Sequence, residues 1–426
     1  MESLENEHRR RAATQSLAVA ARNMLKLAVR NIRRHTARTA LTLSAITFGV
    51  VALILSGGFV VDLLDQFAES LIHSQSGHLQ IARRGFFEGG ASRSQDHLLT
   101  DQGLIRASLA EDPRVVETMG RLSFSALLNN GHADLPVIGN GIEPEKERRL
   151  GTSLTMIEGR PLADKDEYGV LIGQGVAHAL QIKVGDHATL LASTIDGAMN
   201  TLDVEVVGIF QTISKEYDAR GILLALGDAQ ALMQTRAVNV VVAYLARTSQ
   251  TDPVAQRLAA SLPSDSYEVK TWRALNDFYE KTVELYDRQF GVLLLIILLM
   301  VLLGVANTVN MTAFERLSEF GTMRALGNSG AQVFWLVVSE NVLLGFLGAI
   351  AGVTLGAALA LVISHFGIPM PPPPNANVGY IARIRLDSGI IAVAAMVGLA
   401  APVLAAFWPA VRVSRVPVVE ALRSSD

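Results

Sequence analysis

The residues with the clearest chemical pattern lie in a short charged segment, ERLSEFGTMRALGNSGAQVF, between two long uncharged stretches. Glu315 and Glu319 are four residues apart, so on one helix they would repel each other unless a basic surface lay opposite them. Leu317, Phe320 and Met323 recur every three residues and would form an apolar ridge beside those acids. The combination predicts a helix that docks into a groove on a partner. A solvated turn between two helices is the alternative interpretation.

No catalytic motif accompanies this segment. A phosphate-binding loop of the form GxxxxGK[ST] needs a glycine directly before its lysine, and no lysine of this sequence follows a glycine. The sequence also has no HExxH zinc motif, no GxSxG nucleophile elbow and no cysteine. Its histidines are scattered, and even His73 and His78 do not share a helical ligand spacing. We therefore expect no catalytic residue, no metal site and no cofactor on this chain.

The composition indicates that lipid is part of the solvent. Half of the residues are hydrophobic, only 18% are charged, and the mean hydropathy is positive. Basic and acidic residues nearly balance, 37 against 40, so no positive field predicts a nucleic-acid partner. Four stretches are long and apolar enough to cross about 30 Å of hydrocarbon. These predicted transmembrane helices are residues 39–61, 288–314, 331–366 and 387–411.

The distribution of basic residues predicts the orientation of these spans. Basic residues precede the first span and acidic residues follow it, which places the N-terminus in the cytoplasm. Four crossings return the C-terminus to the same side, where three arginines agree, whereas Arg383 and Arg385 on the outer side disagree. The residues that carry this prediction are Arg22, Lys26, Arg30, Arg33, Arg34 and Arg38 before the first span, Asp62, Asp65 and Glu69 after it, and Arg412, Arg415 and Arg423 at the C-terminus.

Ahead of the first span, the sequence predicts an amphipathic helix along the inner membrane surface. Apolar residues repeat on one helical face, opposite the basic residues. An ordinary cytosolic helix packed on its own protein is the alternative. The apolar face consists of Leu17, Ala21, Met24, Leu25, Ala28 and Ile32.

Residues 62–287 are expected to form one outer domain of mixed α and β structure, with helices at both ends that would form a stalk. Short apolar runs predict strands in HLQI, ADLPVIG, YGVLIG, HATLLA, DVEVVGIF and NVVVAYL. The segments GVAHALQIK and TDPVAQRLAASL have helical spacing. The remaining boundaries are a cytoplasmic tail at 1–38, a cytoplasmic segment at 315–330, an outer loop at 367–386 and a second tail at 412–426. In that outer loop, Pro371 to Pro374 predict a rigid, extended spacer.

Small and polar residues in the spans predict contacts between helices. Glycines four residues apart let another helix approach closely in lipid. Polar side chains at membrane depth should face other helices, at a dimer interface or within the bundle, rather than lipid or cargo. The glycines are Gly348, Gly352 and Gly356, and the polar residues are Asn307, Asn310 and Glu340.

The charged segment resembles the coupling helix of FtsX-like ABC-transporter permeases, the MacB/FtsX superfamily of mechanotransmitting transporters, through ERLSEFGTMRALG. LAVRNIRRHTARTALTLSAITFGV is similar to that family's amphipathic helix and first span, and WPAVRVSRVPVVEALR to its C-terminal signature. YGVLIGQGVAHALQIKVGDHATLLA followed by VEVVGIF resembles its MacB-type periplasmic core domain. SGHLQIARRG and VKTWRALNDFY are most similar to the lipoprotein-releasing LolC and LolE type.

The resemblance implies a polytopic α-helical membrane protein with four transmembrane helices and a large α+β periplasmic domain between helices 1 and 2. It also implies a permease in the bacterial inner membrane that dimerises, with an identical or a sibling copy, and binds two copies of a separate ATPase, which would carry ATP and Mg²⁺. A periplasmic carrier or adaptor is a further implied partner. The positions that match the family's coupling residues are Glu315, Arg316, Glu319, Phe320, Gly321, Arg324 and Gly327.

Three functions remain open at this point. The leading one is ATP-driven movement of the outer domain that extracts or exports lipoprotein, lipid or another hydrophobic cargo. An efflux permease for drugs or peptides has the same architecture, and so does an FtsX-like signalling scaffold that controls a periplasmic hydrolase. The outer domain is larger than that scaffold class needs, which favours cargo handling. A membrane-bound enzyme is disfavoured because the sequence lacks a catalytic set.

Overall fold

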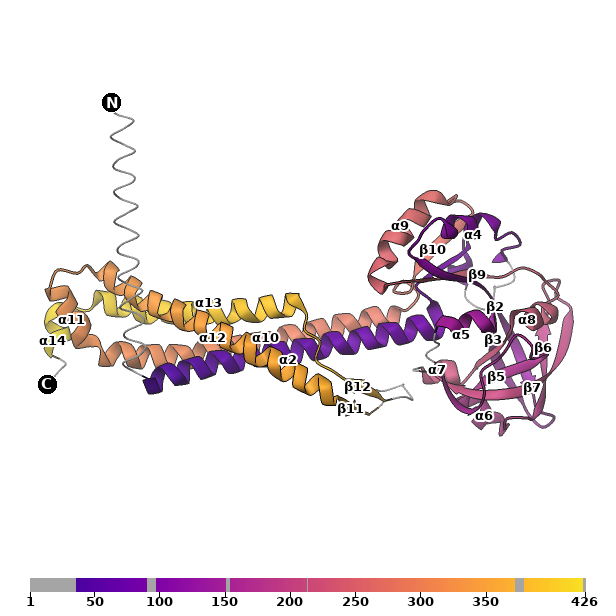
Figure 1. Cartoon of the computed structure of the whole chain (residues 1–426), viewed down its shortest axis with the longest axis horizontal. Helices are drawn as coiled ribbons and strands as arrows, with labels where there is room; N and C mark the ends of the chain where they lie inside the picture. The colour runs from indigo at the N-terminus through magenta and orange to yellow at the C-terminus, as the bar shows by residue number, and fades with distance from the viewer. Residues whose placement is uncertain (1–35, 90–96, 151–153, 213, 372–378, 424–426) are drawn as a thin grey trace, which may run out of the picture. The chain divides into compact units, whose positions relative to one another are not determined.

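The computed structural model describes residues 36–89, 97–150, 154–212, 214–371 and 379–423. These residues form two compact units (Figure 1). Of the described residues, the helical unit contains those up to Leu63, Glu284–Ile368 and those from Ala382, and the sheet unit contains those within Leu64–Val283 and Pro369–Ile381. The predicted amphipathic helix from Leu17 to Ile32 lies outside the described residues, as do residues 372–374 of the proline run.

Four described helices are long and apolar enough to cross a membrane, which confirms the expected number of spans. They are α2 (Thr36–Leu71), α10 (Asp277–Glu315), α12 (Gly330–Phe366) and α13 (Ser388–Arg415). Polar caps fix two of their starts: Ser329 and Gln332 form a capping box at α12, and the Asp387 side chain accepts the Gly389 and Ile390 N–H groups at α13. Two short helices, α11 (Leu317–Ala325) and α14 (Val418–Arg423), lie together at one end of this unit (Figure 1).

Branched aliphatic side chains of α2 and α10 and small side chains of α13 form the core of the helical unit. Ile46 to Ile54 of α2 and Ile297 to Val309 of α10 supply the bulk, while Ala394 to Ala410 of α13 let the backbones approach. Large apolar side chains also remain on the outside, among them Phe48, as expected of helices that face lipid.

The sheet unit is built on ten strands in the order β10-β1-β9-β2-β3-β8-β5-β7-β4, with β6 paired to β2 and β7. Most neighbours are antiparallel, but β3 and β8 are parallel, as are β5 and β7. The strands are β1 (Leu79–Arg83), β2 (Val115–Asn129), β3 (Asp134–Ile142), β4 (Thr155–Gly159), β5 (Gly169–Gly173), β6 (His187–Ser193), β7 (Met199–Gln211), β8 (Gly221–Ala225), β9 (Val240–Leu245) and β10 (Tyr267–Thr271).

The sheet unit has two lobes, each with its own hydrophobic core of strands and covering helices (Figure 1). One core packs α4 and α9 against β1 and β9, and the other packs α6 and α8 against β2, β5, β6 and β7. The long strand β2 contributes to both. The helices are η1 (Ile72–Ser76, a π-helical turn), α3 (Phe86–Gly89), α4 (Gly103–Ala110), α5 (Pro144–Leu150), α6 (Gln174–Leu180), α7 (Lys215–Asp218), α8 (Leu226–Leu232), the 3-10 turn η3 (Thr248–Gln250) and α9 (Thr251–Ser261).

All six predicted strands are confirmed, as β1, β3, β5, β6, β7 and β9, and the two predicted helices are α6 and α9. Four strands, β2, β4, β8 and β10, were not predicted. The described flanks of the proline run also contain a short two-stranded sheet, β11 (Ile368–Met370) with β12 (Tyr380–Ala382).

Candidate functional site: the junction of α10 and α11

The predicted coupling segment is a helix, but not the continuous helix that its acids would share. α10 ends at Glu315, Arg316 has a non-helical backbone, and α11 begins at Leu317. Glu315 and Glu319 therefore lie on different helices, which corrects the expectation of a like-charge pair one turn apart. Gly327 follows α11 with a φ of 102°, a conformation that favours glycine and ends the helix.

The expected apolar ridge of α11 faces its own unit. Phe320 is buried, and Leu317 and Met323 pack against the same helical core. The outward face carries Thr322 and, beyond the helix end, Leu326, whose side chain is 82% exposed. An apolar side chain this exposed at a helix end is a candidate for contact with another protein.

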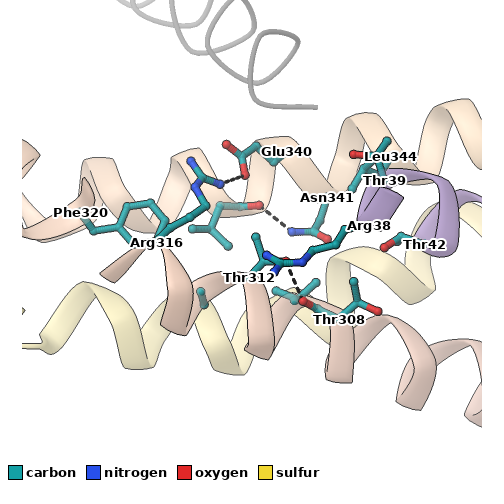
Figure 2. A pocket seen from close by; sticks show the side chains of 13 residues that line it. Arg38, Thr39, Thr42, Thr308, Thr312, Arg316, Phe320, Glu340, Asn341 and Leu344 are labelled. Atoms are coloured by element: carbon teal, nitrogen blue, oxygen red, sulfur yellow. Dashed lines mark hydrogen bonds and ion pairs between the residues drawn. The ribbon is translucent and has the colours of Figure 1, made fainter. Parts of the chain in front are cut away.

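Arg316 anchors α11 to α12. Its Nη1 atom donates to Oε2 of Glu340 at 2.7 Å, and its Nε atom donates to Oε2 of Glu319 at 3.0 Å. The guanidinium carbon lies 5.0 Å from the centre of the Phe320 ring. Figure 2 shows Arg316 pointing toward Glu340. Arg316 and Glu340 are only 6% and 9% exposed, so each charge depends on its partner for the hydrogen bonds that water would otherwise supply.

A second ion pair joins α10 to α2, because Arg38 contacts Glu315. Together Arg38, Glu315, Arg316, Glu319 and Glu340 form a set of charged residues that we call the junction cluster. It links α2, the end of α10, α11 and α12 within the helical unit. Rigid connections of this kind can carry a displacement from one helix to another.

The other end of α11 is tied to the C-terminal segment. Arg324 donates through Nη1 to the carbonyl of Val416, which follows α13. Gly330, at the start of α12, lies against the backbone of Ser414, where a Cβ atom would come within 2.7 Å of the Ser414 oxygen. Gly321 is buried within α11. The predicted coupling residues thus divide into buried anchors, Arg316, Phe320 and Gly321, and exposed or half-exposed positions, Glu315, Glu319, Arg324 and Gly327.

The glycines of α12 lie against α2. Built Cβ atoms on Gly348 and Gly352 would come within 2.7 Å of Ile46 and 2.6 Å of Val50, and one on Gly356 would come within 3.1 Å of Ile54. Close packing here requires the absence of a side chain. Of the polar residues in the spans, Glu340 is paired, while Asn307 is exposed and Asn310 half-exposed on α10 within this single chain.

No sequence motif predicted a site role for Arg38 and Asn341, which lie at this junction, or for Leu326, at the far end of α11. Arg38 is far from Glu315 in sequence, and Asn341 follows Glu340 without any motif. The exposed position of Leu326 depends on which face of α11 turns inward. Arg38 alone belonged to a recognised pattern, the basic residues before the first span, and that pattern predicted membrane orientation rather than a site. No group of three or more candidate metal ligands occurs among the residues that the structure describes.

Comparison with known families decides the class of protein. A model of the MacB-like periplasmic core domain matches residues 39–261, and a model of the FtsX-like permease C-terminal region matches residues 291–418. The chain belongs to the MacB/FtsX-like family of ABC-transporter permeases. The first match covers α2 and the sheet domain as far as α9, and the second covers the chain from α10 to the end of α13.

Curated relatives agree with this assignment. The lipoprotein-releasing system transmembrane protein LolC of Xylella fastidiosa is 26% identical over 73% of this chain and 78% of that protein. LolC of Neisseria meningitidis is 24% identical over 90% of this chain and 94% of that protein. The macrolide export ATP-binding/permease protein MacB of Sodalis glossinidius is 25% identical over 98% of this chain but only 63% of its own length. The MacB/FtsX-like permease described here is therefore an ABC-transporter permease of the LolC, MacB and FtsX type.

Proposed function

We propose that this permease couples ATP hydrolysis on a separate ATPase subunit to movement of its sheet domain, which extracts or exports lipoprotein or another hydrophobic cargo. The sequence contains no phosphate-binding loop, so ATP and Mg²⁺ would be bound by the partner. The arrangement we propose has two permease copies, identical or sibling, and two ATPase subunits. It lies in the inner membrane with both termini in the cytoplasm, as the basic residues favour.

The observation that carries this proposal is the position of α11. It is a short helix between two membrane-length helices, with a buried inner face and an exposed outer face. We propose that Thr322 and Leu326 on the outer face, together with the half-exposed Glu319, contact a groove on the ATPase. A helix laid into a groove is a common way to join two proteins, and the exposed Leu326 would supply apolar contact area once the ATPase covers it.

The junction cluster would carry the movement into the membrane. When the ATPase pushes α11, the Arg316 guanidinium transmits the displacement to Glu340 of α12, and the pair between Arg38 and Glu315 transmits it to α2. Because α2 and α10 contain residues of both units, movement of these helices would reach the sheet domain along continuous backbone. This mechanism needs no cargo passage through the bilayer.

The proposed cargo rests on the relatives. Two LolC proteins cover most of this chain, and their name states that they belong to a lipoprotein-releasing system. A lipid-modified protein is therefore our first choice of cargo, handed to a periplasmic carrier or adaptor. The name of MacB, which states macrolide export, makes a drug the second choice.

Substitution on the outer face of α11 tests the proposal. In the full-length permease, Leu326→Glu should abolish co-purification of the ATPase and stop export, because it places an uncompensated charge in the apolar contact. Glu319→Arg should weaken both, although it also disturbs Arg316. The matched control is Leu104→Glu, which changes an exposed leucine of α4 in the sheet domain and should leave the ATPase bound. Normal ATPase binding and export by Leu326→Glu would contradict the proposal.

A further inference from the structure

A cavity of about 60 Å³ with several polar groups in its lining lies beside the junction cluster, between α2, α10 and α12 (Figure 2). It is lined by hydroxyl, amide and guanidinium groups and the Glu340 carboxylate, with apolar side chains such as Val337 and Leu344 between them. A cavity of this size has room for several water molecules or for a small polar group. Its polar lining includes Arg38, Thr42, Thr308, Thr312, Arg316 and Asn341.

Two atoms of this lining are buried without a hydrogen-bond partner among the described residues: Nη1 of Arg38 and Oδ1 of Asn341. The Asn341 side chain is almost fully buried, since the residue is only 4% exposed. Its amide nitrogen donates to the Val337 carbonyl at 2.9 Å, which fixes the orientation of the amide and leaves the oxygen as an acceptor. Buried polar atoms of this kind normally have a partner, so we expect water or a bound polar group in the cavity.

The threonines of α10 add acceptors rather than donors. Thr308 donates its hydroxyl proton to the Gly304 carbonyl at 3.0 Å, and Thr312 donates its proton to the Thr308 carbonyl at 2.8 Å. Their oxygen lone pairs remain for a ligand. The cavity thus offers one donor atom without a partner, Nη1 of Arg38, whose guanidinium is also paired with Glu315. Its acceptors are the oxygens of Asn341, Thr308 and Thr312, beside the Glu340 carboxylate that Arg316 pairs.

We propose that this cavity binds the head group of phosphatidylethanolamine, with its phosphate on Arg38 and its ammonium group on Asn341, Thr308 and Thr312. An arginine is a strong phosphate donor, and a primary ammonium supplies the N–H donors that the acceptors lack. Phosphatidylcholine carries the same charges but no N–H donor, so it would leave the acceptors unpaired. Basic pockets between transmembrane helices bind the phosphate groups of lipid head groups. Exposed apolar side chains near the cavity in sequence, Leu41 and Met311, would contact the acyl chains.

The test compares the two lipids on the full-length permease, and it does not depend on the ATPase or the cargo. The purified protein is placed in nanodiscs with equal amounts of phosphatidylethanolamine and phosphatidylcholine that have identical acyl chains. It is then released in mild detergent, and the retained lipids are counted by native mass spectrometry. We expect phosphatidylethanolamine to be retained about tenfold over phosphatidylcholine, the value of one or two hydrogen bonds.

Variants locate the binding. Asn341→Leu and Thr308→Val should each remove most of the preference for phosphatidylethanolamine. Thr308 is only half-buried, so its replacement by valine, which has the same shape, should not prevent folding. This variant tests the cavity even if Asn341→Leu folds poorly. The matched control is Thr354→Val, an exposed threonine of α12 that makes the same backward hydrogen bond outside the cavity lining. It should keep the preference.

Three results would overturn the proposal. They are equal retention of both lipids, an unchanged preference in the Thr308→Val variant, and no retained lipid at all, which would mean that water fills the cavity. A further arm adds glycerophosphoethanolamine, which has the same head group without acyl chains. If this soluble compound displaces the lipid at equal concentration, the site recognises a free head group, and the assignment to a membrane lipid is wrong.

Discussion

At the scale of single residues, the Arg316–Glu340 pair shows how a charge is kept within a membrane-spanning bundle. Glu340 is the one acidic residue of α12, and the residue that neutralises it belongs to the connection between two other helices. The acid in the third span was expected to face protein rather than lipid, but its partner could not be predicted, because no local spacing relates residues 316 and 340. The pairing depends on the folded positions of the two side chains, which bring Nη1 of Arg316 within 2.7 Å of Oε2 of Glu340.

Breaking this pair should be costly. Glu340→Ala leaves the Arg316 charge with only the half-exposed Glu319, so the free energy of unfolding should fall by about 3 kcal/mol. Thermal unfolding of the full-length protein in detergent measures the change. The double variant Arg316→Met with Glu340→Leu removes both charges and should recover most of the loss. If the double variant is as unstable as Glu340→Ala, the pair does not account for the stability.

A buried histidine of the sheet domain should make stability depend on pH. His78 accepts the Leu245 N–H through Nδ1 at 3.2 Å, and its Nε2 atom lies 3.2 Å from the hydroxyl of Thr248. Burial lowers the pKa of His78 from 6.5 to about 4, against the opposing charge of Glu69. The folded state therefore keeps His78 neutral, while the unfolded chain binds a proton as the pH falls below about 6.5.

Stability should thus decrease as the pH falls through this window, by at most about 1.4 kcal/mol per pH unit from this residue. His78→Asn keeps an acceptor for the Leu245 N–H and should reduce the loss of melting temperature between pH 7 and pH 5, whereas His132→Asn, at an exposed position, should not. An identical acid sensitivity in wild type and His78→Asn would exclude His78 as its source.

At the scale of elements, hydrophobic stretches predicted the number of spans, and short apolar runs predicted fully buried strands such as β5 and β9, although the similarly buried β8 was missed. The strand β2 was missed because Gly120 and Arg121 interrupt its apolar pattern and because its register shifts near Val115. The break between α10 and α11 was also missed. Arg316 is neither glycine nor proline, and the chain turns there because tertiary contacts hold its side chain.

Packing between α2 and α12 gives a prediction at this scale. Gly352→Ala would place a Cβ atom 2.6 Å from Val50, so the helices must separate, and stability should fall by about 1–3 kcal/mol. Gly291→Ala on α10 is the matched control, because a Cβ there has no atom within 4 Å among the described residues and alanine favours the helix. Thermal unfolding of both variants in the same detergent compares them. Equal melting temperatures would show that the glycine contact is not tight.

At the scale of the whole molecule, each unit has its own core, and α2 and α10 contain residues of both. For the ATPase to reach it, α11 must lie on the side of the membrane where ATP is hydrolysed. A second permease copy could contact α10 through two asparagines, the exposed Asn307 and the half-exposed Asn310. That role stays a prediction, as does the contact with the ATPase.

Cysteine labelling tests this requirement most directly, because the native sequence has no cysteine and one introduced thiol is unique. Thr322→Cys, on the outer face of α11, and Leu104→Cys, in the sheet domain, are exposed to a membrane-impermeant maleimide in right-side-out and in inverted membrane vesicles. We predict that Thr322→Cys reacts only in inverted vesicles and becomes protected when the ATPase is bound, while Leu104→Cys reacts only in right-side-out vesicles. Reaction of Thr322→Cys from the outer side would contradict the account, because no ATPase could then reach α11.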